Sequence, residues 1–345
     1  MSVAPTLLHY DDFQEVVQKR GNHWDKPKWR KVNFHQKEIM NTKPITPAVL
    51  SGSVISVPPL ARKADGSFNI EENRKQIRHL EAGGVSTLLY GGNAILAHVS
   101  LSEYAGLLTM LTELAGQDSL VIPSVGPGFG MMMDQAKLLR EFQFPTAMIL
   151  PTRDVITSDG VATGLRRFVE ATGRPAVLYI KNDGFIEIEA VKRLHDDGLL
   201  SWIKYAIVRD NPANDPYLRR LVDAIGPSQI VSGIGEQPAL THLREFGLAG
   251  FTSGCVCVAP RLSMNMLRAI KAGDFATAER IQAIFRPLED LRNAINPIRV
   301  LHTAVSLVGI GEMGPILPLL SEVSEANRPA IREAAAKLLE QEQLP

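Results

Sequence analysis

From residue 51 onwards, short apolar segments alternate with longer segments whose apolar residues recur with the period of a helix. Strands that alternate with helices form βαβ units, and such units build a parallel sheet. The expected strands are 53–57, 85–90, 120–125, 146–150, 176–180, 202–206, 229–232 and 250–253. Eight units of this kind predict an α/β protein with a (β/α)8 TIM barrel.

The segments between these strands are expected to be helices, at 71–82, 101–115, 134–142, 161–171, 188–196, 216–225 and 239–246. A doubly wound open sheet is the alternative architecture, and it typically carries a glycine-rich dinucleotide turn after its first strand. The first strand here is followed by Val57-Pro58-Pro59-Leu60, which is not such a turn. The sequence therefore favours the barrel.

The chain continues beyond the barrel at both ends. We expect an N-terminal extension over residues 1–50 with one short helix at 11–21, a barrel over 51–260, and C-terminal helices over 261–345 that complete and extend the barrel. The four helices expected in this last part are 261–272, 275–291, 297–307 and 325–341.

Charge and cysteine content exclude several classes of protein. Lys and Arg number 37, as do Asp and Glu, so the formal charge of zero favours neither nucleic acid nor an anionic membrane as partner. Trp24 and Trp29 lie among mixed charges, which favours docked tryptophans over a nucleic-acid-binding arm. Cys255 and Cys257 form no disulfide framework and indicate a reducing compartment. Because no segment looks like a signal peptide or a membrane span, we expect a cytoplasmic protein.

Lys204 lies within an apolar run, 199–208, that is expected to form a buried strand. An unpaired ammonium is costly away from water, and burial lowers the pKa of an amine. A neutral amine is a nucleophile that condenses with a carbonyl to form a Schiff base. Tyr179 ends another predicted strand, where a phenol could carry protons. The alternative is a Lys204 that points outward to a helix or to solvent.

The active site of a (β/α)8 barrel lies at the C-terminal ends of its strands. Gly91, Gly92 and Asn93 follow one strand, and glycines there allow backbone amides to approach a ligand closely. Arg153 and Lys181 follow two other strands and could supply positive charge for an anionic substrate, as could Arg209, which follows a third.

Motifs for other chemistries are missing from the sequence. It has no Gly-x-Ser-x-Gly elbow and no phosphate loop that ends in Gly-Lys-Ser/Thr. Its eight histidines are scattered, so no metal constellation is evident. Cys255 and Cys257 have no complementary pair, which favours small residues on a pocket floor over metal ligands. We therefore expect neither a metal nor another cofactor.

Taken together, these segments resemble the dihydrodipicolinate synthase/N-acetylneuraminate lyase superfamily of Schiff-base aldolases and lyases. The resemblance runs from about residue 51 to the C-terminus. The segments that carry it are Gly52–Pro59, Gly83-Gly84-Val85, Gly91–Ala94, Leu178-Tyr179-Ile180, Trp202-Ile203-Lys204, Val231–Gly235, Gly250–Gly254 and Asn296-Pro297-Ile298.

The resemblance implies a 2-oxo acid, commonly pyruvate, held as an imine on Lys204, with Tyr179 as the acid/base group. It also implies that Gly91, Gly92 and Asn93 bind the oxo-acid carboxylate, and that Gly233 and Ser253 line the pocket. Members of the superfamily are often homotetramers, so a homo-oligomer, a dimer or a tetramer, is expected.

The sequence departs from the family pattern at three places. The family's Thr-Thr pair is replaced by Gly92-Asn93, and its Pro-Tyr-Tyr by Pro151-Thr152-Arg153. The synthase arginine that grips the second substrate aligns with Gly184. These departures indicate a substrate other than that of dihydrodipicolinate synthase itself, with Arg153 or Lys181 holding a different anionic group.

The leading interpretation is a metal-independent class I lyase, an aldolase or a dehydratase, that acts on pyruvate or a pyruvate-derived sugar acid. Because the proton relay is altered, a protein that only binds a small oxo acid on the same scaffold is the alternative. A metal-dependent barrel aldolase is a third possibility.

Overall fold

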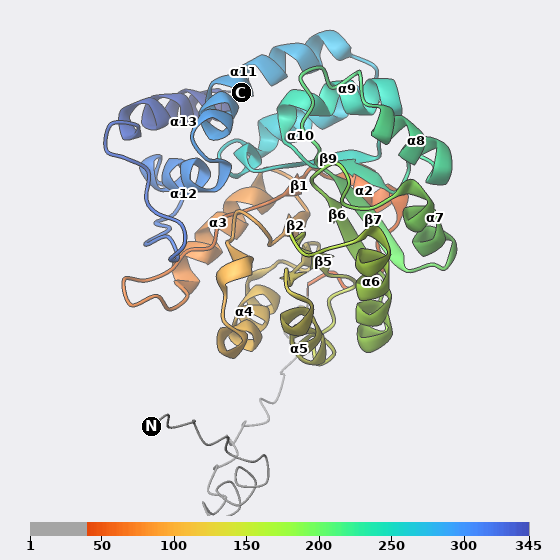
Figure 1. Cartoon of the computed structure of the whole chain (residues 1–345). Helices are drawn as coiled ribbons and strands as arrows, with labels where there is room; N and C mark the ends of the chain where they lie inside the picture. The colour runs from red at the N-terminus through yellow and green to blue at the C-terminus, as the bar shows by residue number, and fades with distance from the viewer. Residues whose placement is uncertain (1–39, 345) are drawn as a thin grey trace, which may run out of the picture. The chain divides into compact units, whose positions relative to one another are not determined.

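A computed structural model of the chain describes residues 40–344. Its parallel strands form one sheet in the order β3-β2-β1-β9-β8-β7-β6-β5-β4. The first strand, β1 (Ile55–Ser56), pairs with both β2 (Thr87–Leu89) and β9 (Gly250–Ser253). The beginning and the end of the strand series therefore lie side by side, as a closed barrel requires, and the predicted (β/α)8 barrel is confirmed (Figure 1).

The segment expected to be one strand at 120–125 is two short strands, β3 (Leu120–Ile122) and β4 (Ser124–Val125). They are separated by Pro123, which has no N–H to donate to a neighbouring strand. The carbonyl of Pro123 still accepts a hydrogen bond from the Met148 N–H at 2.9 Å. β3 pairs with β2 and β4 pairs with β5, so the two short strands together take the place of one of the eight barrel strands.

The other strands lie within or close to the predicted segments. They are β5 (Met148–Ile149), β6 (Ala176–Ile180), β7 (Leu200–Tyr205) and β8 (Ile230–Ser232). The helices of the barrel are α3 (Ile70–Ala82), α4 (Leu101–Leu114), α5 (Phe129–Leu139), α6 (Ser158–Thr172), α7 (Ile188–Asp196), α8 (Pro216–Ile225) and α9 (Glu236–Phe246), with short 3-10 turns η1 (Leu96–His98) and η2 (Cys255–Cys257).

Local sequence signals explain where several of these helices begin. Ser100 and Glu103 form a reciprocal capping box at the start of α4. Asp215 caps α8, and Pro216 follows at its first position, where a missing N–H costs nothing. α5 begins five residues earlier than expected because the glycines around Phe129 suggest a turn, whereas Gly128 serves as the N-cap.

The C-terminal helices are α10 (Pro260–Lys271), α11 (Phe275–Ala294), α12 (Pro297–Leu307) and α13 (Arg328–Gln343). α11 packs against α9, α10, α12 and α13. These helices, cyan to blue in Figure 1, lie together along one side of the barrel. They belong to the same compact unit as the barrel.

A short helix that the sequence did not suggest, α2 (Pro47–Gly52), precedes the first strand. It packs against β9, and its Leu50 is buried. Asn41 forms a bridge with Leu120 of β3. Residues 40–50, which we assigned to the extension, therefore contact the barrel, whereas the helix at 11–21, Trp24 and Trp29 lie outside the described residues. Between residues 40 and 344, no helix has both the length and the apolar character needed to cross a bilayer.

Candidate active site

Lys204 and Tyr179 face each other on adjacent strands. β6 and β7 pair in parallel with Tyr179 in register with Lys204, so both side chains leave the sheet on the same side. The Nζ of Lys204 lies 4.7 Å from the centre of the Tyr179 ring. The next residue, Tyr205, points the other way and donates a hydrogen bond to Asp215, the N-cap of α8. The alternative of an outward-facing Lys204 is therefore wrong.

The environment of Lys204 favours the neutral amine. Lys204 is 4% exposed, and burial, together with the charges of Lys181 and Arg292, lowers its pKa to about 7. A substantial fraction of the amine is therefore unprotonated near neutral pH. Burial raises the pKa of Tyr179 to about 12, so its phenol keeps its proton. The pair thus offers a nucleophile and a hydrogen-bond donor at one point.

Gly233, which follows β8, leaves the space that the lysine occupies. A Cβ at this position would lie 2.9 Å from Cγ of Lys204 and 2.8 Å from the carbonyl oxygen of Tyr205. Only a glycine allows the lysine stem to lie against the backbone here. Gly233 thus lies next to Lys204, and its place in a substrate pocket stays a prediction.

Gly91, Gly92 and Asn93 follow β2 and begin a tight turn. Leu96 N–H donates to the Gly91 carbonyl at 3.2 Å, and the space beside Gly92 is open. Asn93 is 8% exposed, and its Nδ2 donates to the Val57 carbonyl at 2.7 Å. This amide ties the turn after β2 to the end of β1.

The three predicted cations differ in their surroundings. Arg209 is held by Asp183 through two hydrogen bonds of 2.6 and 2.7 Å and by Asp215, so its charge is already matched. Arg153 and Lys181 are exposed. Loss of water around the Lys181 ammonium and the nearby charge of Arg153 both lower its pKa. The charge of Arg153 is therefore felt at the Lys181 ammonium.

A buried charged cluster near the ends of β8 and β9 was missed in the sequence. It consists of Glu236, Cys255, Glu289 and Arg292, and we call it the α11 cluster. Glu289 accepts the first two N–H groups of α9, from Glu236 and Gln237, at 2.9 Å each. The side chain of Glu236 accepts from Ser263 Oγ at 2.7 Å. The sequence signal that could have revealed it is the pair Glu289 and Arg292, three residues apart on the buried face of an amphipathic helix.

Oxygen and sulfur atoms of Glu236, Cys255 and Glu289 lie within 4.8 Å of one another. This spacing would suit a metal ion, but both Glu289 oxygens accept backbone N–H groups and Arg292 donates to Cys255 Sγ at 3.7 Å. The positive charge beside the carboxyls is thus already supplied by a guanidinium. Ser253, predicted to line the pocket, lies next to this cluster, and its Oγ accepts from Val256 N–H at 3.0 Å.

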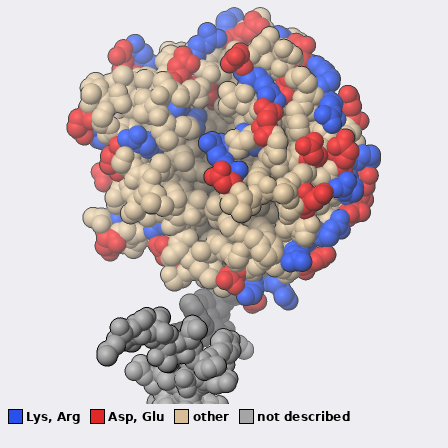
Figure 2. All heavy atoms as spheres, viewed as in Figure 1, with Lys and Arg blue, Asp and Glu red and all other residues tan. Residues whose placement is uncertain are grey.

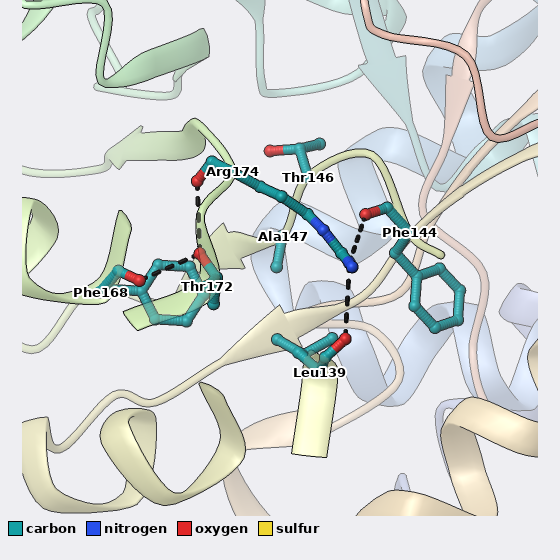
Figure 3. A pocket seen from close by; sticks show the side chains of 7 residues that line it. All are labelled: Leu139, Phe144, Thr146, Ala147, Phe168, Thr172 and Arg174. Atoms are coloured by element: carbon teal, nitrogen blue, oxygen red, sulfur yellow. Dashed lines mark hydrogen bonds between the residues drawn. The ribbon is translucent and has the colours of Figure 1, made fainter. Parts of the chain in front are cut away.

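Two cavities lie away from Lys204. The one in Figure 3 has a volume of about 10 Å³, the lower limit for one water molecule. There Arg174 donates hydrogen bonds to the carbonyls of Phe144 and Leu139, so its guanidinium is already used by backbone groups of neighbouring segments. A wider groove of about 1040 Å³ lies between α5 and α6 and reaches Phe185, but neither Lys204 nor Tyr179 lines it.

A closed barrel with a buried lysine beside a tyrosine is an arrangement that can support lysine-imine chemistry. Known proteins agree with this assignment. Residues 51–338 match the Dihydrodipicolinate synthetase family, and the chain belongs to that family. The predicted superfamily and enzyme class are thereby confirmed.

Individual relatives are distant but match most of the chain. The "Probable 5-dehydro-4-deoxyglucarate dehydratase" of Xanthobacter autotrophicus is 26% identical over 299 residues, which cover 83% of this chain and 95% of that protein. Dihydrodipicolinate synthase from Bacillus clausii superposes with a TM-score of 0.74 at 24% identity, over 86% of this chain and 99% of that one. A catalytic lysine mutant of Ruminococcus gnavus sialic acid aldolase gives 0.73 at 15% identity, over 86% and 98%. The two structures support the fold.

Proposed function

We propose that this protein is a dehydratase that holds a 2-oxo sugar acid as an imine on Lys204 and eliminates water from it. The observation that carries the proposal is the buried Nζ of Lys204, 4.7 Å from the Tyr179 ring centre, in a site that lowers the lysine pKa to about 7. Several relatives are named as dehydratases of 5-dehydro-4-deoxyglucarate, which supports water elimination over aldol cleavage.

The reaction begins when the neutral amine adds to the keto carbon and the resulting carbinolamine loses water. The cationic imine withdraws electrons, so the adjacent carbon loses a proton to water and an enamine forms. The enamine electrons then expel the hydroxyl from the next carbon. Tyr179, which is protonated at neutral pH, transfers its proton to this hydroxyl, which leaves as water, and the phenol regains a proton from the solvent. Hydrolysis of the imine frees Lys204.

Substrate binding in this proposal uses the residues at the strand ends. Gly91, Gly92 and Asn93 bind the carboxylate next to the keto group, and Gly233 and Ser253 shape the pocket. Lys181 and Arg153 bind a second carboxylate at the far end of the substrate. A glucarate derivative has two carboxylates, which fits a site with the turn after β2 at one end and the two cations at the other. No cofactor takes part in this scheme.

We also propose that the protein works as a homo-oligomer, a dimer or a tetramer, in the cytoplasm. Cys255 and Cys257 are both buried as free thiols, which suits a reducing compartment.

Trapping the imine tests the proposal. The full-length protein is incubated with pyruvate and sodium borohydride, and the mass increase is mapped by peptide mass spectrometry. We expect it on the peptide that contains Lys204, and none in Lys204→Met, while Lys192→Met on the exposed face of α7 is labelled like the wild type. Failure of every 2-oxo acid to label Lys204 would instead favour the alternative of a binding protein.

Turnover tests the finer part of the proposal. With 5-dehydro-4-deoxyglucarate, loss of the substrate after exhaustive chelation would support a metal-independent dehydratase. Arg153→Ala is expected to raise KM for this dicarboxylate about tenfold, in line with the loss of a charged hydrogen bond, without changing labelling by pyruvate. Unchanged kcat and KM in that variant would remove Arg153 from the site.

A further inference from the structure

Arg292 reaches the barrel from the last turn of α11 and is held in one orientation. It is 8% exposed. Its Nε donates to the Pro297 carbonyl at 3.2 Å, and its Nη1 donates to Cys255 Sγ at 3.7 Å. Its remaining nitrogen, Nη2, donates no hydrogen bond to any residue between 40 and 344. One edge of the guanidinium is thus fixed and the other is available.

The available nitrogen lies beside the residue that follows β9. A Cβ added to Gly254, the residue after β9, would lie 2.6 Å from Arg292 Nη2 and 2.9 Å from Asn93 Nδ2. Two donors from distant parts of the chain therefore converge over this glycine. Asn93 belongs to the turn that also presents Gly91 and Gly92, and its amide has a second hydrogen besides the one donated to Val57.

The groups behind Arg292 leave its charge only partly matched. The acidic groups that act on it most are Cys255 after β9, Glu289 on its own helix and Glu236 at the start of α9, and Cys257 and Lys204 are also near. Burial is the largest influence on the carboxyls of Glu236 and Glu289, and it raises the pKa of both. Burial also raises the pKa of the Cys255 thiol. Two close buried carboxyls do not both ionise readily, so the cluster does not carry two full negative charges. A guanidinium with a free edge in such a site attracts an anion.

We propose that Arg292 binds the substrate carboxylate next to the keto group, together with the turn that carries Asn93. This inference rests on the imine function proposed above and adds to it a charged residue from the C-terminal helices. Gly92 and Asn93 stand where the family has two threonines, and the guanidinium supplies the anion binding that those hydroxyls would otherwise give.

The arrangement also sets the substrate class. The charges of Arg292 and Lys181 both act on Lys204. A substrate with a carboxylate beside its keto group and another at its far end would match both cations. A neutral ketone would gain nothing from Arg292, whereas pyruvate would gain its full effect. The preference for pyruvate over a neutral ketone is therefore the property that Arg292 controls.

The test compares pyruvate with hydroxyacetone, a neutral ketone of similar size, in borohydride trapping on Lys204. In Arg292→Met, we expect the pyruvate concentration that gives half-maximal labelling to rise about 10- to 100-fold. Both ketones are compared at about pH 9, where Lys204 is mostly neutral, because loss of the Arg292 charge also raises the pKa of Lys204. The value for hydroxyacetone should then change less than about twofold, because its imine does not use the guanidinium. Arg286→Met, an exposed position on the same helix, is the matched control and should behave like the wild type.

A second variant covers the case in which Arg292→Met does not fold. Gly254→Ala keeps Arg292 but places a methyl group 2.6 Å from its Nη2, and the αR backbone of Gly254 accepts alanine. It should reduce the preference for pyruvate in the same direction. Equal losses with both ketones, or an unchanged preference in either folded variant, would overturn the role of Arg292 and leave the imine function standing. A wild-type protein that no ketone labels would overturn both.

Discussion

The side chain of Lys204 lies directly over the Cα of Gly233, so that a Cβ there would come within 2.9 Å of the lysine Cγ. The position of the Lys204 side chain on β7 therefore requires a glycine after β8. The neighbouring backbone, the Tyr205 carbonyl at 2.8 Å from the same point, leaves no room for adjustment.

Gly233→Ala is expected to displace the lysine stem and to slow imine trapping with pyruvate at least about tenfold. Overpacking at such a site also destabilises a fold by about 1–3 kcal/mol. Trapping rates and urea unfolding measure the two effects. Gly106→Ala is the control, because no atom lies within 4 Å of the added Cβ in α4 and alanine favours helix. Wild-type trapping by Gly233→Ala would contradict the contact.

The rate of imine formation should depend on pH through Lys204. Its pKa of about 7 means that the nucleophilic, neutral fraction grows as pH rises. Between pH 6 and 7 the rate should increase about fivefold, and above pH 8 it should level off. The measurement is the initial rate of trapping by pyruvate and cyanoborohydride at saturating pyruvate.

Lys181→Met should shift this pH profile to higher pH. The charge of Lys181 contributes to the low pKa of Lys204, and without it the ammonium form is less disfavoured. The midpoint of the profile should therefore lie at higher pH than in the wild type. Lys192→Met, which removes an exposed lysine paired with Asp196, should leave the midpoint in place. An unchanged or lower midpoint in Lys181→Met would show that its charge does not lower the pKa of Lys204.

Glu289→Ala should destabilise the protein by about 2–4 kcal/mol, because the first two N–H groups of α9 lose their acceptor in a buried site. Urea unfolding followed by circular dichroism gives this free energy. Asp290→Ala removes the neighbouring, exposed carboxylate, whose only partner among the described residues is the side chain of Gln237, and should cost less than about 0.5 kcal/mol. Equal costs would mean that Glu289 does not cap α9.

Arg209→Met should lower stability but not substrate affinity. Its guanidinium is used by Asp183 and Asp215, and the side chain of Asp215 is fully buried. Leaving that carboxylate without its cation is expected to cost about 2–4 kcal/mol. KM for the best dicarboxylate substrate should stay within about twofold. A tenfold rise in KM with unchanged stability would place Arg209 in the substrate site instead.

The barrel and the closeness of Lys204 to Tyr179 could be predicted because they depend on short-range patterns. The alternation of strand and helix patterns predicts the eight barrel strands, and a lysine within an apolar run singles out Lys204. The break at Pro123 was not apparent, since the apolar run continues through the proline. The α11 cluster was also missed, because Glu289 and Arg292 read locally as ordinary helix charges and meet Cys255 and Gly254 only after the helices fold back.

Asn93 is a second residue whose contacts could not be predicted from the local sequence. Its position after β2 is evident from the sequence, but its bond to Val57 and its closeness to Arg292 depend on contacts between residues 36 and about 200 positions apart. The sequence thus located the chemistry on the strands more completely than the groups that surround it.

Arg292 and Glu289 come from a helix that follows the last strand of the barrel. During synthesis the whole ring of strands can leave the ribosome while the pocket still lacks its guanidinium and α9 its cap. A nascent chain that stops after residue 260 would carry the reactive amine without the parts that select an acid over a neutral ketone. The complete site is therefore expected only once the C-terminal helices have folded against the barrel.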